Sequence, residues 1–382
     1  MDWLAQALGL PEIFHNAAEG PGGGVIQGTA SEATLVALLA ARARAEAARA
    51  ESTSLADLRS RMVVYTSDQA HSSVKKATMI AGIDPGLVRV LPAAWCEAPA
   101  AAAAAVQSSE AVPTHNWSLQ ADALEQAIAA DEAAGLVPVF VCGTIGTTST
   151  GAVDDIAGLA KVAHAHSAWL HVDAAWAGAA LVCPEYRPLA RGVELADSFD
   201  FNPHKWLLTN FDCSAFYVRD KTAVLDALSL TPEYLRSKHY DAGLVQDYRD
   251  WQVPLGRRFR ALKLMLVMQN YGTRGLQEHI RRSTHLAARL AQRIVEHPHL
   301  ELVTSPSLGL VCFRMAGTDE DNMALMHAVN DTGKCMFIHS KVGGQVVLRL
   351  ATGGALQTAD TLDAAWHVIA EAVAAHQTSE HA

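Results

Sequence analysis

The sequence predicts an α/β protein, with a large domain built on a mostly parallel sheet and a smaller C-terminal α+β domain. Two observations lead to this fold class. Short apolar, β-branched runs alternate with helical patterns through the first part of the chain. A long helical stretch and a different arrangement of strands follow. The runs lie at 62–65, 87–91, 137–141, 169–172 and 198–201. Because such strands are apolar throughout, their alternation with helices is typical of a parallel sheet covered on both faces.

The C-terminal part has another pattern. Beyond residue 258 a long helical stretch leads to apolar runs at 302–304, 310–313 and 346–350, which lie around short helices. We therefore expect a large domain over residues 1–260 and a small domain over 261–382. With 382 residues, half of them hydrophobic, the chain is long enough to bury a large core.

Composition and charge exclude several classes of partner. The formal net charge of −10 and the pI near 5.9 argue against nucleic acid or an anionic membrane, because both need clustered Lys and Arg. No stretch approaches the roughly 20 apolar residues that span a bilayer, and no cationic leader precedes an apolar run at Met1. Six scattered cysteines without a CxxC pair predict reduced thiols and no metal site. We expect a cytoplasmic protein with a small-molecule substrate.

The first elements are a glycine-rich loop at 20–24, a short segment at 25–27 and a long Ala/Leu-rich helix over about 31–48. At the mouth of this helix, the small residues of 28–32 would let backbone N–H groups approach an anion, and the helix dipole favours negative charge. The Ser31 hydroxyl would add a hydrogen bond. An ordinary N-cap is the alternative. Neither GxGxxG nor the Walker pattern occurs, so dinucleotide or ATP binding has little support.

Two further clusters follow predicted strands. His71, after the first strand, could stack its flat ring on a flat cofactor, and a helix-start hydrogen bond is the alternative. Asp173 ends the fourth run, where an unpaired buried carboxylate would cost several kcal/mol. A pyridinium N–H would be a suitable partner, and the small Ala175 would let a ring lie against the backbone. On local sequence alone, an N-cap to the next helix stands equal to this interpretation.

The fourth cluster is the run 201–206, which contains Lys205. Apolar and aromatic neighbours would disfavour the charged form of this lysine, which makes it a candidate Schiff-base amine. A solvated surface charge is the alternative, as for most lysines. Ligands of open α/β sheets bind at the carboxyl ends of the strands, so we expect the four clusters to converge there.

Several long motifs in one order closely resemble the group II decarboxylases that depend on pyridoxal 5′-phosphate (PLP), specifically the aromatic L-amino acid decarboxylases. The motifs lie at 22–28, 67–73, 169–175, 201–208, 210–213, 248–252, 255–260 and 347–349. The resemblance spans nearly the whole chain except an Ala-rich stretch at 98–106, which we interpret as a surface insertion. It implies an aminotransferase-like large domain of fold type I, PLP as the cofactor and a homodimer.

The resemblance implies roles around the cofactor ring. Lys205 holds the cofactor aldehyde, and Asp173 pairs with the pyridine nitrogen. His71 stacks on one face of the ring, and Ala175 lies against the other. Thr148 neighbours the ring substituents.

The resemblance also implies roles around the phosphate and the substrate. Ala30, Ser31 and Asn202 are expected to bind the phosphate. His204 is expected near the phosphate or the substrate carboxylate. Tyr234 matches a loop tyrosine that closes over the site, and it is our candidate proton donor to the substrate Cα, with His71 as a candidate relay.

The reaction expected from the resemblance is decarboxylation of an aromatic L-amino acid such as tryptophan, tyrosine, phenylalanine or DOPA. Some relatives instead decarboxylate and deaminate the substrate to an aldehyde, with a different residue at the position of Tyr234 or His71. Both residues therefore favour simple decarboxylation. Glutamate and histidine decarboxylases share the fold, but the run 202–206 is more similar to the aromatic group. Gly256 leaves room for an indole without excluding phenols.

One departure from the family pattern bears on activity. Relatives carry a sizeable segment before the point that matches Met1, and it helps to form the dimer and supplies apolar walls of the substrate pocket. We expect its absence here to affect substrate affinity and turnover more than PLP binding. A PLP-binding but inactive protein is therefore a further alternative.

Overall fold

The structure, a computed structural model, describes residues 1–17, 20–51, 53–97, 115–230, 246–306 and 308–380. Within these residues the large domain is built on a seven-stranded sheet in the order β1-β9-β8-β7-β6-β2-β3. Strands β3, β2, β6, β7 and β8 are parallel, and β9 runs antiparallel to both of its neighbours, β8 and β1. The strands are β1 (Gly23–Gln27), β2 (Met62–Ser67), β3 (Val88–Leu91), β6 (Val137–Thr144), β7 (Trp169–Asp173), β8 (Ser198–Phe201) and β9 (Ser214–Val218).

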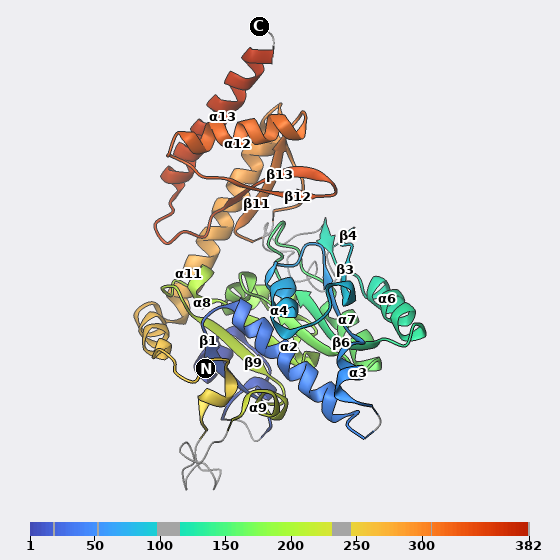
Figure 1. Cartoon of the computed structure of the whole chain (residues 1–382). Coiled ribbons are helices and arrows are strands. Elements are labelled where there is room, and N and C mark those ends of the chain that lie inside the picture. The colour runs from blue at the N-terminus through green and yellow to red at the C-terminus, as the bar shows by residue number, and fades with distance from the viewer. Residues whose placement is uncertain (18–19, 52, 98–114, 231–245, 307, 381–382) are drawn as a thin grey trace.

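The parallel strands are those that the apolar runs predict, and the α/β fold class is confirmed. Every residue of β2, β6, β7 and β8 is buried, because helices cover both faces of the sheet. Successive side chains point to opposite faces, so Leu170 and Val172 enter one core and Trp169 enters the other. The long α2 (Ala30–Ala47) crosses one face with α4 (Ser73–Ala81) and α9 (Thr222–Leu228), as Figure 1 shows. Helices α6 (Ala121–Ala133) and α7 (Ile156–Ala165) pack on the other.

The small domain has a four-stranded sheet in the order β10-β11-β13-β12. Helix α11 leads into this domain from the large one, and its backbone is non-helical at Gly272, where φ is 61°. The boundary at residue 260 stays a prediction, although α11 begins there. The elements are α11 (Arg260–Glu296), β10 (Leu300–Leu302), β11 (Leu310–Met315), α12 (Asp319–Asp331), β12 (Ile338–Val342), β13 (Gln345–Ala351) and α13 (Ala359–Glu380).

Several strands differ from the sequence expectation. The glycine-rich loop was expected to extend to Gly24, but β1 already begins at Gly23. Gly24 lies opposite Tyr217 of β9, and a Cβ atom would approach that ring to 2.6 Å, so glycine serves close strand pairing here. Strands β9 and β12 were not expected, nor was the two-stranded sheet of β4 (Ala94–Glu97) and β5 (His115–Ser118), and β10 begins two residues before the expected run at 302–304. The Ala-rich stretch at 98–106 lies outside the described residues.

No helix in the described part of the chain is long and apolar enough to cross a membrane. Each of the six cysteines lies within the described ranges and is free, as their spacing predicts.

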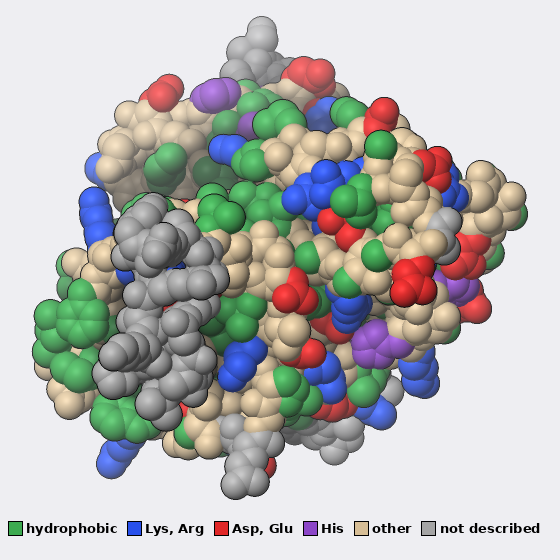
Figure 2. Space-filling model, turned by 60° about the horizontal axis from the view of Figure 1, so that its bottom comes forward, with side chains coloured by type: hydrophobic (Ala, Val, Ile, Leu, Met, Phe, Trp, Pro, Cys, Tyr) green, Lys and Arg blue, Asp and Glu red, His purple; other side chains and the backbone are tan. Residues whose placement is uncertain are grey.

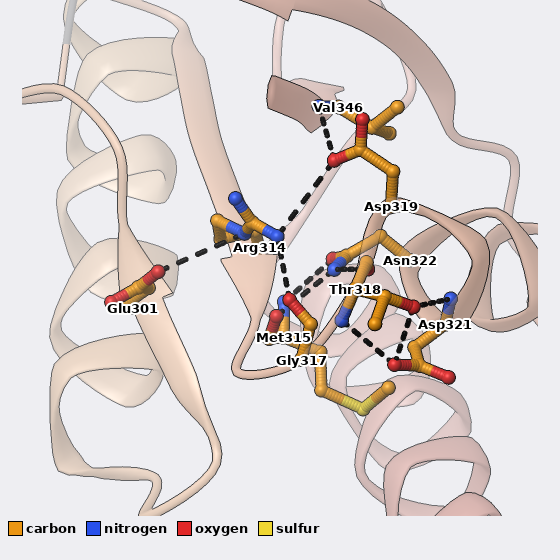
Figure 3. Close-up of polar contacts among 9 residues, drawn as sticks. All are labelled: Glu301, Arg314, Met315, Gly317, Thr318, Asp319, Asp321, Asn322 and Val346. Atoms are coloured by element: carbon orange, nitrogen blue, oxygen red, sulfur yellow. Dashed lines mark hydrogen bonds and ion pairs between the residues drawn. The ribbon is translucent and has the colours of Figure 1, made fainter. Parts of the chain in front are cut away.

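A polar network fixes the start of α12 in the small domain (Figure 3). Thr318 and Asp321 form a reciprocal capping box. Asn322, fully buried, accepts the N–H of Met315 at 2.7 Å and donates to the carbonyl oxygens of Met315 and Thr318, each at 2.9 Å. Arg314 donates to the Gly317 carbonyl at 2.8 Å. The network therefore joins β11 to α12, with the fully buried Asn322 and Met315 at its centre.

We expect Asn322→Ala to lower the free energy of unfolding by about 2–4 kcal/mol, because it leaves the N–H and the carbonyl of the buried Met315 without their partner. Chemical denaturation measures the change. Gln292→Ala, at an exposed position on α11, is the control and should change stability by less than about 0.5 kcal/mol. Equal stability of the two variants would contradict the role of Asn322.

Candidate active site

A cavity of about 380 Å³ lies at the carboxyl ends of the parallel strands. The four predicted clusters converge on it, since the segments that follow β1, β2, β7 and β8 each contribute to its wall, as does the segment after β6. The lining residues are Thr29, Ala30, Ser31, His71, Thr144, Gly146, Thr147, Thr148, Asp173, Ala175, Trp176, Asn202, His204, Lys205, Phe211, Leu310, Arg349 and Ala351. Nine of the ten predicted site residues are among them. The tenth, Tyr234, lies outside the described residues.

The start of α2 forms one side of the cavity. Thr29 precedes the helix without a side-chain cap, and Ala30 and Ser31 begin it. The Ala30 N–H donates to Asn202 Oδ1 at 3.1 Å, which ties the helix start to the end of β8. This 18-residue helix begins at the cavity and directs the positive N-terminal end of its dipole into it, so this side favours an anionic group.

Asp173 contributes a carboxylate to the cavity wall. Its carboxylate is 4% exposed at the end of β7, and Oδ1 accepts the Ala175 N–H at 2.9 Å. This hydrogen bond forms a local turn, but Asp173 is not the expected N-cap, because the next helix, η3 (Ala177–Val182), has Trp176 at its N-cap. Asp173 lines the cavity instead. A carboxylate this buried favours a cationic partner.

Lys205 and His71 also face the cavity. Lys205 is exposed, although its apolar neighbours predicted burial. Helix α8 (Pro203–Trp206) buries Trp206 and leaves Lys205 on the side of the open cavity. His71 is exposed as well, and its Nδ1 accepts the Ser73 N–H at 3.1 Å at the start of α4. The helix-start hydrogen bond is therefore present, while stacking on a cofactor ring stays a prediction. In the neutral ring the hydrogen sits on Nε2.

His204 is held more firmly. Its Nδ1 lies 2.7 Å from the Cys213 carbonyl oxygen and accepts the Cys213 N–H at 2.8 Å. Burial lowers the pKa of this imidazole. The ring of Phe211 contacts it edge-on, with centroids 4.7 Å apart.

The buried side chain of Asp154 holds the turn that follows β6. Asp154, buried, accepts the N–H groups of Thr144 at 2.8 Å and Leu119 at 2.7 Å. Burial raises the pKa of Asp154 to about 7. Gly146 adopts φ of 86° beside Ala177, a close approach that leaves no room for a side chain. Thr148 is thereby brought to the cavity wall.

The small domain supplies residues that sequence reasoning did not assign. Arg349 of β13 and Leu310 of β11 line the cavity from that side. Burial lowers the pKa of Arg349, and its Nε has no hydrogen-bond partner among the described residues. An arginine inside the apolar run 346–350 was the signal that could have singled it out. Gly256, expected to shape the substrate pocket, lines a different pocket with Gln27 and Arg257.

The donor set fits PLP. The cavity offers an anion site at α2, a buried carboxylate for a ring nitrogen, an imidazole beside the ring space and an amine for an aldehyde. Thr144 Oγ1 and Arg349 Nε are buried polar atoms without a hydrogen-bond partner in the described ranges, so a polar ligand in the cavity could satisfy them. Within the same ranges no group of His, Cys, Asp and Glu is suited to a metal ion.

Comparison with known proteins agrees with this chemistry. Residues 1–316 match the pyridoxal-dependent decarboxylase conserved domain. The chain is 43% identical to mouse aromatic-L-amino-acid decarboxylase over 97% of its own length and 73% of the relative. It is equally similar to phenylacetaldehyde synthase of Arabidopsis thaliana, over 97% and 72%. A solved structure of Oryza sativa TDC with PLP and tryptamine superposes with a TM-score of 0.88 at 43% identity, covering 97% of this chain and 74% of that one.

Proposed function

Because this chain belongs to the pyridoxal-dependent decarboxylase family, we propose that it uses PLP to convert an aromatic L-amino acid into the corresponding amine and CO₂. The observation that carries the proposal is the convergence of Lys205, Asp173, His71 and the start of α2 on one cavity. Relatives named as aromatic-L-amino-acid, tryptophan and tyrosine decarboxylases support the substrate class.

Different residues of the cavity would bind different parts of the cofactor. PLP, when bound, supplies an electron sink for the bond that breaks at the substrate carbon. Lys205 Nζ would hold the aldehyde carbon, and Asp173 would hold the ring nitrogen in its protonated form, because an opposite charge favours the cation. His71 and Ala175 would enclose the ring from its two faces, with Thr148 beside its substituents.

The phosphate and the substrate would occupy opposite parts of the cavity. Ala30, Ser31 and Asn202 would bind the phosphate at the positive end of α2. His204, held by Cys213, would orient a neighbouring anionic group. Tyr234 would close over the site, exclude water and donate a proton to Cα after CO₂ leaves, with His71 as a relay.

We also propose a homodimer in the cytoplasm. The start of α11 and the segment before it expose large apolar side chains, and Phe259 is 77% exposed. Figure 2 shows hydrophobic side chains on the left of the face it presents, the side on which α11 begins in Figure 1. Such a surface is typical of a subunit interface. Free cysteines are typical of a reducing compartment. The exposed residues are Val253, Leu255, Phe259, Leu262, Met265, Leu266 and Tyr271.

A second candidate reaction is decarboxylation with deamination to an aromatic aldehyde. It is favoured by the 43% identity to a phenylacetaldehyde synthase, which equals the identity to the mouse decarboxylase. The residues expected at the proton-donating positions, Tyr234 and His71, favour the amine instead.

We expect borohydride treatment of the PLP-loaded full chain to attach a pyridoxyl group to Lys205, because this amine lines the cavity beside the other cofactor residues. Peptide mapping by mass spectrometry locates the label. Lys205→Arg should prevent the labelling, whereas Lys263→Arg, an exchange outside the cavity lining, should leave it intact. A label on Lys75, Lys76 or any other lysine would overturn the assignment.

We expect the wild-type chain to release CO₂ and amine from an aromatic L-amino acid, and Asp173→Ala to lower the rate about 100-fold or more. The variant should retain much of its PLP, because the phosphate contacts at α2 remain. Amine release and bound PLP are measured on the same samples. Near-normal turnover by a folded variant would refute the role of Asp173, and PLP binding without turnover by the wild type would favour an inactive PLP-binding protein.

We expect Tyr234→Phe to form amine about 100-fold more slowly and to shift product toward aldehyde, ammonia and hydrogen peroxide. Without the phenol proton, Cα stays unprotonated for longer, and O₂ competes for it. Amine and aldehyde are quantified from one reaction, with PLP content as the control. An unchanged amine yield without aldehyde would mean that another group donates the proton, with His71 the next candidate.

A further inference from the structure

A second buried carboxylate, Asp200, lies beside Asp173. The two residues are direct partners on the parallel strands β7 and β8, so their side chains leave the same face of the sheet. Asp200 is fully buried, and its carboxylate oxygens have no hydrogen-bond donor among the described residues other than the adjacent imidazole of His171. A carboxylate placed in this way is costly when ionised, so its presence behind the site needs an explanation.

His171 is the group that faces Asp200 most closely. It precedes Asp173 by two residues on β7 and therefore lies on the same face. Its Nε2 is 3.1 Å from Asp200 Oδ1, and neither side chain is exposed to solvent. The ring of Phe140 stacks on His171 with centroids 5.8 Å apart. Packing thus holds the imidazole against the carboxylate.

The hydrogen bonds of Ser198 indicate which nitrogen of His171 carries the proton. The Trp169 indole N–H donates to Ser198 Oγ at 2.8 Å, and the same oxygen lies 2.9 Å from His171 Nδ1. The hydroxyl hydrogen of Ser198 can then be donated to Nδ1. This arrangement leaves the imidazole proton on Nε2, where it points toward Asp200.

The other groups around Asp200 set the balance of charge. Burial, and next the negative charge of Asp173, raise the pKa of Asp200 to about 7, while His171 and Lys205 oppose this rise. From β6, the Cys142 thiol faces the same pair of carboxylates. Two apolar groups also lie on this face, since Phe216 of β9 pairs with Asp200 and the buried side chains of α2 include Ala33.

We propose that Asp200, held against His171, is a positioning residue that sets the charge beside Asp173 and thereby how firmly the ring nitrogen of PLP is kept protonated. The proposal rests on the proposed function. When Asp200 is ionised, a second negative charge favours the protonated ring nitrogen, and when Asp200 is neutral this help is lost. As the pH rises through about 7, Asp200 gains its charge just as the ring nitrogen becomes easier to deprotonate.

The first measurement needs no cofactor. Infrared difference spectra of the PLP-free protein should show a carboxylic-acid carbonyl band that disappears as the pH rises through about 7. Asp154, also buried with a raised pKa, should contribute part of this band. Asp200→Asn should remove the remainder, whereas Asp131→Asn, a buried carboxylate remote from the cavity that binds Arg89, should leave the band intact.

The second measurement uses the PLP-loaded chain. NMR of the isotope-labelled ring nitrogen should show that Asp200→Asn loses the ring proton at a pH lower by about one unit or more than the wild type and Asp131→Asn. His171→Gln keeps Asp200 and removes an opposing group, so it should move the infrared titration to higher pH. This variant tests the pair independently if Asp200→Asn does not fold.

The outcomes separate the two proposals. An unchanged infrared band in Asp200→Asn, or a ring nitrogen that titrates alike in Asp200→Asn and wild type, would overturn the role of Asp200 while the proposed function stands. A wild-type chain that binds no PLP would overturn the proposed function, and the role of Asp200 with it.

Discussion

The need to neutralise a buried carboxylate at the end of β7 organises the whole site. Asp173 is nearly inaccessible to water, and the local turn at Ala175 supplies only one hydrogen bond to it. Parallel strands place their carboxyl ends at one edge of the sheet, so the amine of Lys205 and the positive end of α2 reach the same cavity without long loops. The fold thus supplies charges of both signs around a space that a zwitterionic, phosphorylated ring would fill.

The sheet and most of the site could be predicted from sequence because both depend on local patterns. The apolar runs that become β2, β6, β7 and β8 are buried on two faces, and that burial is visible as uninterrupted hydrophobicity. Three of the four polar clusters lie at the carboxyl end of such an element, and the fourth follows the short segment 25–27. Their convergence therefore followed from the topology of a parallel sheet, and the motifs of a known family supplied the individual roles.

What escaped prediction depends on contacts between distant segments. Arg349 reaches the cavity only because the small domain packs over it, and no local pattern reports that packing. The exposure of Lys205 depends on how α8 turns, although its apolar neighbours suggested burial. The pairing of Asp200 with Asp173 depends on the register of two strands separated by the segment 174–197. Spacing along the chain alone does not determine that register.

The cavity wall drawn from two domains has a thermodynamic consequence. Thr144 and Asp173 belong to the large domain and Arg349 to the small domain, which has a hydrophobic core of its own, so neither unit contains the binding site alone. A ligand that contacts both adds its binding free energy to the docking of the domains. Heat or denaturant should therefore separate the domains more readily in the empty protein. A substitution that destabilises the small domain should therefore lower cofactor affinity, even when the substituted residue lies far from the ring.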